Sequence, residues 1–310
     1  MNSFSHIRFL QRHEIDDSKW NQLIEDSPNG LIYAKTFYLD HMAKHWDALI
    51  LGDYEVIMPL TWNKKFGFYY LFQPPFTRML GVFQKDSQPF PVMEFLSAVP
   101  AKFRYWDIDL NETNTLSSQP IGMIKEILRK NHFLNLNKKH TELSLHYNRL
   151  AKRMQRNALN NQFEIVRNVF PEEIISLYEK YYGGNHPNIT WTNYQQLSLC
   201  MNIAFKNGQA ITYLAKWPNG ETAAFYLLLI DKNYVYSLMG GSTMSGKKAG
   251  AFYLLTDTVI KDHAESNRIL RFEGSDIPGI ALFNASFGST LIRYPHIKMN
   301  NLPFPIKYLK

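Results

Sequence analysis

The segment Lys247–Ala251 is the first candidate for chemistry in this sequence. It lies between an expected strand and an expected helix, and two lysines precede Gly250. Backbone N–H groups at the start of a helix and the helix dipole together attract anions, and lysines strengthen that attraction. Lys247, Lys248, Ala249, Gly250 and Ala251 are therefore expected either to hold a phosphate group or to form a solvated basic loop.

A second candidate is a stripe of cations at positions i, i+3, i+4 and i+7 of an expected helix: Arg149, Lys152, Arg153 and Arg156. On a helix these positions share one face. The apolar residues between them lie on an adjoining face, which would let the helix dock with the stripe exposed. The stripe predicts either a guide for a phosphate-bearing substrate or a solubilising surface.

Proton transfer requires a base and an acid, and the sequence offers both. Glu273 ends an expected strand and can accept a proton or orient an amine; equally, it can cap the expected helix Ile277–Ser286. Asp276 has the same two interpretations. Tyr236 and Tyr253 can donate a proton to a leaving group, although tyrosines at such places often only pack.

Metal binding and covalent catalysis find less support. His41 and His45 have i, i+4 spacing on the expected helix Thr36–Trp46, which can bind zinc, but Met42 replaces the glutamate of the zinc-protease motif. No third ligand is evident, so no metal is expected. Cys200 is the single cysteine, which excludes an internal disulfide, and no histidine partner is evident in the sequence.

Composition limits the classes of protein. The chain has 310 residues, is 45% hydrophobic and 20% charged, and carries a formal net charge of +7. This balance supports about two globular domains and favours anionic partners such as a phosphorylated cofactor, a nucleotide-linked substrate, RNA or an acidic membrane surface. Met1–Gln11 lacks the pattern of a signal peptide, and the longest apolar stretch, Ala223–Ile230, is too short to span a bilayer. We expect a cytoplasmic protein.

The elements that must position these residues alternate between helices and strands. The expected helices are Ser18–Asp26, Thr36–Trp46, Pro91–Val99, Pro120–Lys130, Asn148–Asn160, Pro171–Tyr182, Thr192–Asn207, Ala249–Ala264 and Ile277–Ser286. The expected strands are Ala48–Leu51, Glu55–Trp62, Phe66–Phe72, Phe103–Leu110, Thr141–His146, Gln162–Asn168, Ala210–Lys216, Thr222–Ile230, Tyr234–Met239, Ile269–Glu273 and Thr290–Tyr294.

The order of these elements repeats. Each half reads as helix, hairpin, third strand, helix and strand, with different loop lengths. Repetition of both element order and hairpin position favours a duplicated domain, with the halves at residues 1–138 and 139–310.

The segment from Tyr234 onward carries a family resemblance. A strand is followed by Gly240-Gly241-Ser242, Lys247–Ala251 and a helix, and then by Arg271–Ser275, Pro278–Asn284 and Phe287-Gly288. This order resembles the C-terminal half of the FemABX-like tandem GNAT acyltransferases, which include peptidoglycan aminoacyl transferases and proteins of polysaccharide biosynthesis. The resemblance covers roughly residues 140–300, and the first half shares only the topology.

The resemblance implies a fold and a set of ligands. The fold would be α/β (α+β), with two tandem GNAT-like domains, each a mixed, mostly antiparallel sheet flanked by helices. The donor would be an acyl-CoA or an aminoacyl-tRNA. The second donor is considered because Phe252 stands where the pyrophosphate loop of GNAT enzymes, which binds coenzyme A, has a small residue. Substrate contacts would come from Arg149, Arg153, Arg156 and Phe287, and backbone N–H groups near Leu238-Met239 would hold the oxyanion.

We therefore expect an acyl- or aminoacyl-transferase that acts on an amine or hydroxyl of a cell-envelope or polysaccharide precursor by direct attack. The partners would be a small-molecule or nucleotide-linked substrate and, with an aminoacyl donor, tRNA. Two alternatives stay open: a non-catalytic ligand-binding protein on a degenerate GNAT scaffold, and an RNA-binding module that uses the basic helix.

Overall fold

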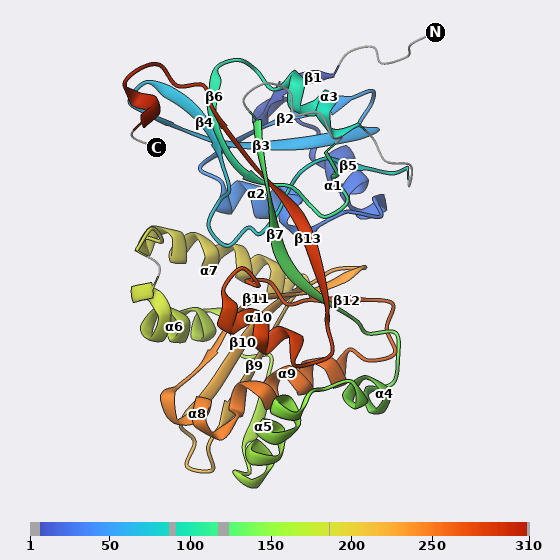
Figure 1. The fold of residues 1–310 in the computed structure, drawn as a ribbon, viewed down its shortest axis with the longest axis vertical. Helices are drawn as coiled ribbons and strands as arrows, with labels where there is room; N and C mark the ends of the chain where they lie inside the picture. The colour runs from blue at the N-terminus through green and yellow to red at the C-terminus, as the bar shows by residue number, and fades with distance from the viewer. Residues whose placement is uncertain (1–6, 87–90, 117–123, 186, 309–310) are drawn as a thin grey trace. The chain divides into compact units, whose positions relative to one another are not determined.

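The computed structural model describes residues 7–86, 91–116, 124–185 and 187–308. The chain forms two compact units, of which the first comprises Met1–Arg129 and Arg293–Lys310 and the second Lys130–Ile292 (Figure 1). The sequence had suggested a boundary at residues 138 and 139. The structure instead returns the end of the chain to the first unit.

The first unit is built on a mixed sheet. Its strands are β1 (Arg8–Gln11), β2 (His45–Leu51), β3 (Val56–Lys65), β4 (Phe68–Phe72), β5 (Phe83–Gln84), β6 (Phe103–Asp109) and the later part of β13 (Thr290–Asn300). Its helices are α1 (Asp17–Asp26), α2 (Thr36–Met42) and α3 (Val92–Ala98). The strand order is β1-β2-β3-β4-β6-β13, with β5 beside β3, and β4 pairs with β6 in parallel.

The second unit repeats this plan. Its strands are β7 (Ile124–Asn135, from Lys130 onward), β8 (Glu164–Arg167), β9 (Ala210–Lys216), β10 (Thr222–Ile230), β11 (Tyr234–Ser242) and β12 (Ile269–Arg271). Its helices are α4 (His140–Leu145), α5 (Arg149–Asn160), α6 (Pro171–Tyr182), α7 (Trp191–Lys206), α8 (Met244–Ala249), α9 (Ala251–Asp262) and α10 (Pro278–Ala285). The strand order is β7-β12-β11-β10-β9-β8, and β11 pairs with β12 in parallel.

Alternation along β10 explains why the sheet of the second unit is covered on both faces. Tyr226 and Leu228 belong to the apolar cluster that includes Leu255 of α9. Phe225, which points to the opposite face, contacts the ring of Tyr182 of α6 at 6.3 Å between centroids. Because successive side chains of a strand point to opposite faces, a continuously apolar strand such as β10 must be covered by helices on both sides.

One apolar cluster of the first unit lies between its sheet and α3. Phe95 and Leu96 of α3 join Leu49, Leu60 and residues of the neighbouring strands in one buried apolar cluster. Burial of each such side chain stabilises the unit by about 1.5–3 kcal/mol relative to exposure.

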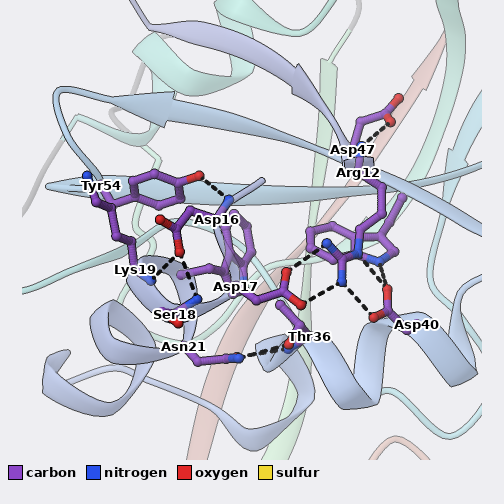
Figure 2. Close-up of polar contacts among 12 residues, drawn as sticks. Arg12, Asp16, Asp17, Ser18, Lys19, Asn21, Thr36, Asp40, Asp47 and Tyr54 are labelled. Carbon is purple, nitrogen blue, oxygen red and sulfur yellow. Dashed lines mark hydrogen bonds and ion pairs between the residues drawn. The ribbon is translucent and has the colours of Figure 1, made fainter. Parts of the chain in front are cut away.

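Helix α1 begins with a polar cap. The Asp16 carboxylate accepts hydrogen bonds from the backbone N–H groups of Ser18 and Lys19 at 2.9 and 3.1 Å (Figure 2). Asp16 is therefore the N-cap of α1.

The fold class is confirmed: each unit is a mixed, mostly antiparallel sheet flanked by helices, and both units follow the order hairpin, third strand, helix and parallel strand. No helix among the described residues is long and apolar enough to cross a membrane.

Two expected elements are wrong. The helix expected at Pro120–Lys130 is strand β7 from Ile124 onward, and the rest of that range lies outside the described residues. The strand expected at Thr141–His146 is helix α4, in which Leu143 is buried and Leu145 is 73% exposed. In both segments tertiary pairing and packing override a local pattern that fits either element.

Candidate active site

In the second unit, β11 and β12 separate partway along β11. Their parallel pairing joins Tyr234–Tyr236 to Ile269–Arg271, whereas β11 continues to Ser242 beside β10. The β10–β11 register also shifts between Leu227 and Leu228, which leaves Leu238 as an extra residue. A bulge of this kind re-aims backbone groups. Ser237 and Leu238, at this bulge, are half-buried.

The end of β11 is glycine-rich because aromatic rings pack on its backbone. A Cβ at Gly240 would lie 2.7 Å from the Phe252 ring, and one at Gly241 would lie 2.3 Å from the Tyr182 ring. The Tyr182 hydroxyl also donates to the carbonyl of Ser242 at 3.0 Å. These contacts hold β11 in place where it has left β12.

The equivalent separation in the first unit is closed by the chain itself. Beyond the parallel β4–β6 pair, the Gln73 N–H donates to the Asp107 carbonyl at 3.0 Å. The Leu80 N–H then donates to the Asp109 carbonyl at 2.9 Å, and the Asn111 N–H donates to the Leu80 carbonyl at 2.8 Å. The two units therefore share a topology, but in the first unit no corresponding strand edge is left unpaired among these described residues.

Glu273, the expected base, lies just past the end of β12 and is buried. Its carboxylate accepts from the Asn131 side chain at 2.7 Å, and the Arg271 Nε lies 3.5 Å away. The backbone of Glu273 has a left-handed φ of 58°. The Glu273 N–H donates to the Asn131 Oδ1 at 2.9 Å, which stabilises this conformation. The N-cap of α10 is Ile277, so Glu273 does not cap that helix. Asp276 instead accepts from the Lys130 N–H at 2.9 Å.

A buried serine–histidine pair adjoins Glu273. The Ser275 Oγ lies 2.9 Å from the His132 Nδ1 and accepts from the Asn284 side chain at 3.1 Å. Which of Ser275 Oγ and His132 Nδ1 donates depends on the tautomer of the imidazole. Burial lowers the pKa of His132 and so favours its neutral form. Sequence patterns did not indicate this pair, because its members come from β7 and the loop before α10.

Arg271 is the second residue that the sequence did not single out for a role. Its side chain is fully buried, and its guanidinium lies 4.5 Å from the Phe133 ring and 4.9 Å from the Tyr234 ring. Together with Glu273 it forms a buried ion pair between aromatic rings. The available signal was an arginine within the apolar run Ile269–Phe272, since arginine is almost never fully buried unless it is paired.

The two expected proton donors differ in their surroundings. Tyr236 is fully buried and its hydroxyl donates to the Asp231 carboxylate. Tyr253 is half-buried; burial raises its pKa, whereas a hydrogen bond with Ser286 and the positive charge of Arg153 lower it. Tyr253 therefore lies near one cation of the α5 stripe.

Phe287 lies in the core. It is fully buried, and its ring contacts those of Tyr147, Phe283 and Tyr253 at centroid distances of 5.2, 5.2 and 5.7 Å. The structure therefore gives Phe287 a packing role beneath Tyr253.

The expected basic loop at Lys247–Ala251 is largely helical, because α8 ends at Ala249 and α9 begins at Ala251 on the other side of Gly250. The expected helix Ala249–Ala264 corresponds to α9. Gly250 has a φ of 84°, and a Cβ there would lie 2.3 Å from the Met154 carbonyl of α5. Asn157 of α5 donates to the Lys248 carbonyl at 3.0 Å. Ala249 and Ala251 are buried, while Lys247 and Lys248 are exposed.

The basic stripe is exposed as the sequence predicted. Asn148 caps α5 by accepting from the Ala151 N–H at 3.0 Å, and Ala151 and Ala158 are buried. The four cations are exposed: Arg149, Lys152, Arg153 and Arg156. Helices α5 and α8 lie side by side (Figure 1), so the stripe and the two lysines of α8 belong to neighbouring elements.

The histidine pair considered for zinc is not on one helix. Helix α2 ends at Met42, the His41 Nδ1 faces the Phe37 carbonyl at 2.7 Å, and His45 begins β2. Within the described part of the chain, no group of three or more His, Cys, Asp or Glu residues could hold a metal ion. Burial raises the pKa of Cys200, so its thiol is a poor nucleophile.

The first unit contains a polar group that the sequence did not reveal. The Asp109 carboxylate lies 2.8 Å from the His296 Nδ1 and 2.9 Å from an Arg129 nitrogen. His296 and Asp109 are both buried and face each other across β13 and β6. Residues 187 positions apart along the chain form this pair, so no spacing rule could have found it.

The chain has a tandem GNAT fold of the FemABX-like kind, as its similarity to solved structures shows. No protein-family model matches the sequence, and no curated protein matches it. Among solved structures it is similar to FemX, with a TM-score of 0.67, 13% identity and coverage of 98% of this chain and 99% of that chain.

Two further solved structures share the fold. A tandem GNAT protein from the clavulanic acid biosynthesis pathway has a TM-score of 0.55 and 12% identity, covering 96% of this chain and 99% of that chain. The C-terminal domain of a protein from Agrobacterium fabrum, described as a lysylphosphatidylglycerol synthetase, has a TM-score of 0.56 and 10% identity, covering 92% of this chain and 91% of that chain.

Proposed function

We propose that the chain is a transferase that moves an acyl or aminoacyl group to an amine or hydroxyl of a cell-envelope or polysaccharide precursor. The observation that carries this proposal is the separation of β11 and β12 beyond Tyr236, with its bulge at Leu238. A free strand edge can hold an extended donor by main-chain hydrogen bonds, and N–H groups at the bulge can stabilise the oxyanion of a tetrahedral intermediate.

We further propose that the two units, expected from the sequence as domains 1–138 and 139–310, have different roles in the reaction. In the first unit the strand separation is closed by Gln73 and Leu80, which supports a substrate-shaping role. The second unit has the open edge of β11 and would bind the donor.

Aminoacyl-tRNA is our preferred donor. A coenzyme A pyrophosphate would need an open loop before α9, whereas Gly250 packs closely on Met154 and the Lys248 carbonyl is occupied by Asn157. The exposed cations of α5 and α8 instead form a surface without acidic residues in either helix. Such a surface suits the phosphates of RNA. One similar structure is also named for lysylphosphatidylglycerol, which is an aminoacylated lipid.

The proposed roles of individual residues follow from their positions. Glu273, held by Asn131 and Arg271, would orient the acceptor amine. Tyr253, beside Arg153, would donate a proton to the leaving group. Direct attack is preferred to a covalent intermediate because Cys200 is buried.

In the test, the purified protein is mixed with a labelled donor, either an aminoacyl-tRNA or an acyl-CoA, and with a panel of amine and hydroxyl acceptors. The measurement is the transfer of the label to the acceptor. We expect transfer from aminoacyl-tRNA and a strong loss in the triple variant Arg149→Ala, Arg153→Ala and Arg156→Ala. A matched control removes three exposed lysines of the same unit: Lys206→Ala, Lys232→Ala and Lys261→Ala. Absence of binding and transfer with every donor would overturn the proposal.

A non-catalytic binding protein is the second candidate, and one observation favours it. The Glu273 carboxylate is already engaged by Asn131 and Arg271. Donor binding without turnover, unchanged in Glu273→Gln, would support this candidate in place of a transferase.

A further inference from the structure

The first unit contains a cleft at the start of β2 that the proposed transfer reaction does not use. Its volume is about 290 Å³. That size is near the lower end of small-molecule sites, which begin at about 300 Å³. The side chains that matter here are Arg12, Asp40, His45, Trp46, Asp47 and Trp62.

One wall of the cleft is fixed by Arg12. Its guanidinium donates to Asp40 at 2.7 and 2.8 Å and to Asp17 at 2.7 and 3.0 Å (Figure 2). It also lies 4.9 Å from the Trp46 ring, whose indole N–H donates to Asp40 at 2.8 Å. The positive charge of Arg12 is therefore committed to two carboxylates, and this wall is rigid before any ligand arrives.

Asp47 is a buried carboxylate in the same cleft with long contacts. It accepts from the backbone N–H of Arg12 at 3.3 Å, and the Lys102 Nζ lies 4.0 Å away. The side chain of Trp62 and the charge of His45 also act on this carboxylate and lower its pKa. A charge-assisted N–H···O bond is usually about 2.7–2.9 Å long. Burial raises the pKa of Asp47, so these contacts do not offset the loss of hydration. The carboxylate can accept a further, shorter bond.

The aromatic residues around Asp47 suit a cation. Lys102 lies 4.6 Å from the Phe9 ring and 5.9 Å from the Trp62 ring, and His45 stacks on Trp62 at 4.4 Å. Aromatic faces beside a carboxylate attract ammonium groups through the ring quadrupole and the negative charge together.

We propose that this cleft binds a small ligand through a primary ammonium group that donates to Asp47 beside Trp62. Lys102, the chain's own ammonium, approaches this carboxylate only to 4.0 Å, and the ligand would make the closer contact. The lining also includes Lys44 and His13, so an anion is the competing ligand. Asp47 would repel an anion, and Arg12 is already paired. The site is built from residues of the first unit that the proposed transferase activity does not use, so it does not depend on that activity.

The first experiment uses three probes of one size: butylammonium, butanol and butyrate. The indole N–H signal of Trp62, assigned with Trp62→Phe, is followed by nuclear magnetic resonance during titration. We expect saturable binding of butylammonium in the millimolar range and none of the other two. Saturable binding of butyrate, or none of butylammonium, would overturn the proposal.

Variants then locate the site. Asp47→Asn should weaken butylammonium binding by about tenfold or more, because a hydrogen bond to a charged group is lost. Asp53→Asn, which changes an exposed carboxylate paired with Lys19 in the same unit, should leave it unchanged. Lys102→Gln should tighten binding by removing the competing cation, a direction that damage to the fold would not produce. Unchanged affinity in Asp47→Asn would contradict the proposal.

Discussion

At the scale of single residues, Arg271 and Glu273 form a buried ion pair in the second unit. Their side chains are 0% and 4% exposed, and 3.5 Å separates Arg271 Nε from a Glu273 oxygen. Desolvation of two charges is compensated only while both are present. The pair thus fixes the loop that follows β12.

Arg271→Met should destabilise the protein by about 3–5 kcal/mol, because it leaves Glu273 as an uncompensated buried charge. The double variant Arg271→Met and Glu273→Gln should recover much of that loss. Urea denaturation of the two single variants and the double variant measures the coupling free energy. Additive losses would show that the two residues do not stabilise each other.

His132 should make stability depend on pH. Burial lowers its pKa below the ordinary 6.5, so the unfolded chain binds the proton more readily than the folded protein does. Its contribution is therefore complete above about pH 6.5 and declines as the pH falls toward the lowered folded value.

We expect the unfolding free energy of His132→Gln to fall less steeply below pH 6.5 than that of the wild type. Burial also lowers the pKa of His263, which contributes in the same direction, so the comparison must be between variant and wild type. Parallel curves from denaturation at several pH values would contradict the assignment.

At the scale of elements, the junction of α8 and α9 depends on one glycine. Gly250→Ala should cost about 1–2 kcal/mol for the left-handed backbone and about 1–3 kcal/mol more for the clash with Met154. Gly208→Ala is the matched control, because Gly208 also has a positive φ but nothing lies within 4 Å of its Cβ position. Equal losses of unfolding free energy in the two variants would remove the packing argument.

Helix α5 should determine the salt dependence of RNA binding. If Arg149, Arg153 and Arg156 each contact a phosphate, their triple alanine variant should reduce the slope of log affinity against log salt by about 2. Titrations of tRNA at several salt concentrations measure this slope. An identical slope in the variant would exclude the stripe as the RNA contact.

The sequence predicted elements well where local chemistry determines them. The hairpin of β9 and β10 has the expected bounds because Asn219-Gly220 supplies its turn. The prediction from sequence failed at β7, because the pairing of β7 with β12 joins residues far apart in the chain, such as Phe133 and Arg271. Glu273 and the α5 cations could be named as candidates because their own sequence neighbourhoods indicate them. The contacts His132–Ser275 and Asp109–His296 join residues far apart in the chain, so the sequence alone could not indicate them.

At the scale of the whole molecule, the two units are not consecutive pieces of chain. Residues 1–138 lack β13, which pairs with β6, and residues 139–310 lack β7, which pairs with β12. A cut at 138 therefore removes a paired strand from each unit.

We expect fragments 1–138 and 139–310 to be unfolded or aggregated when expressed separately, whereas Lys130–Ile292 should fold alone. Circular dichroism and the dispersion of amide proton signals distinguish these outcomes. Cooperative unfolding of both halves cut at 138 would show that the paired strands are dispensable.

The late return of β13 also has a consequence for synthesis. The ribosome releases the chain from its N-terminus, so the second unit is complete before His296 emerges. Until then β6 lacks its partner, and Asp109 lacks the imidazole that shares its buried position. The nascent first unit therefore displays an unpaired strand edge throughout translation of the second, and the edge is closed only when β13 emerges.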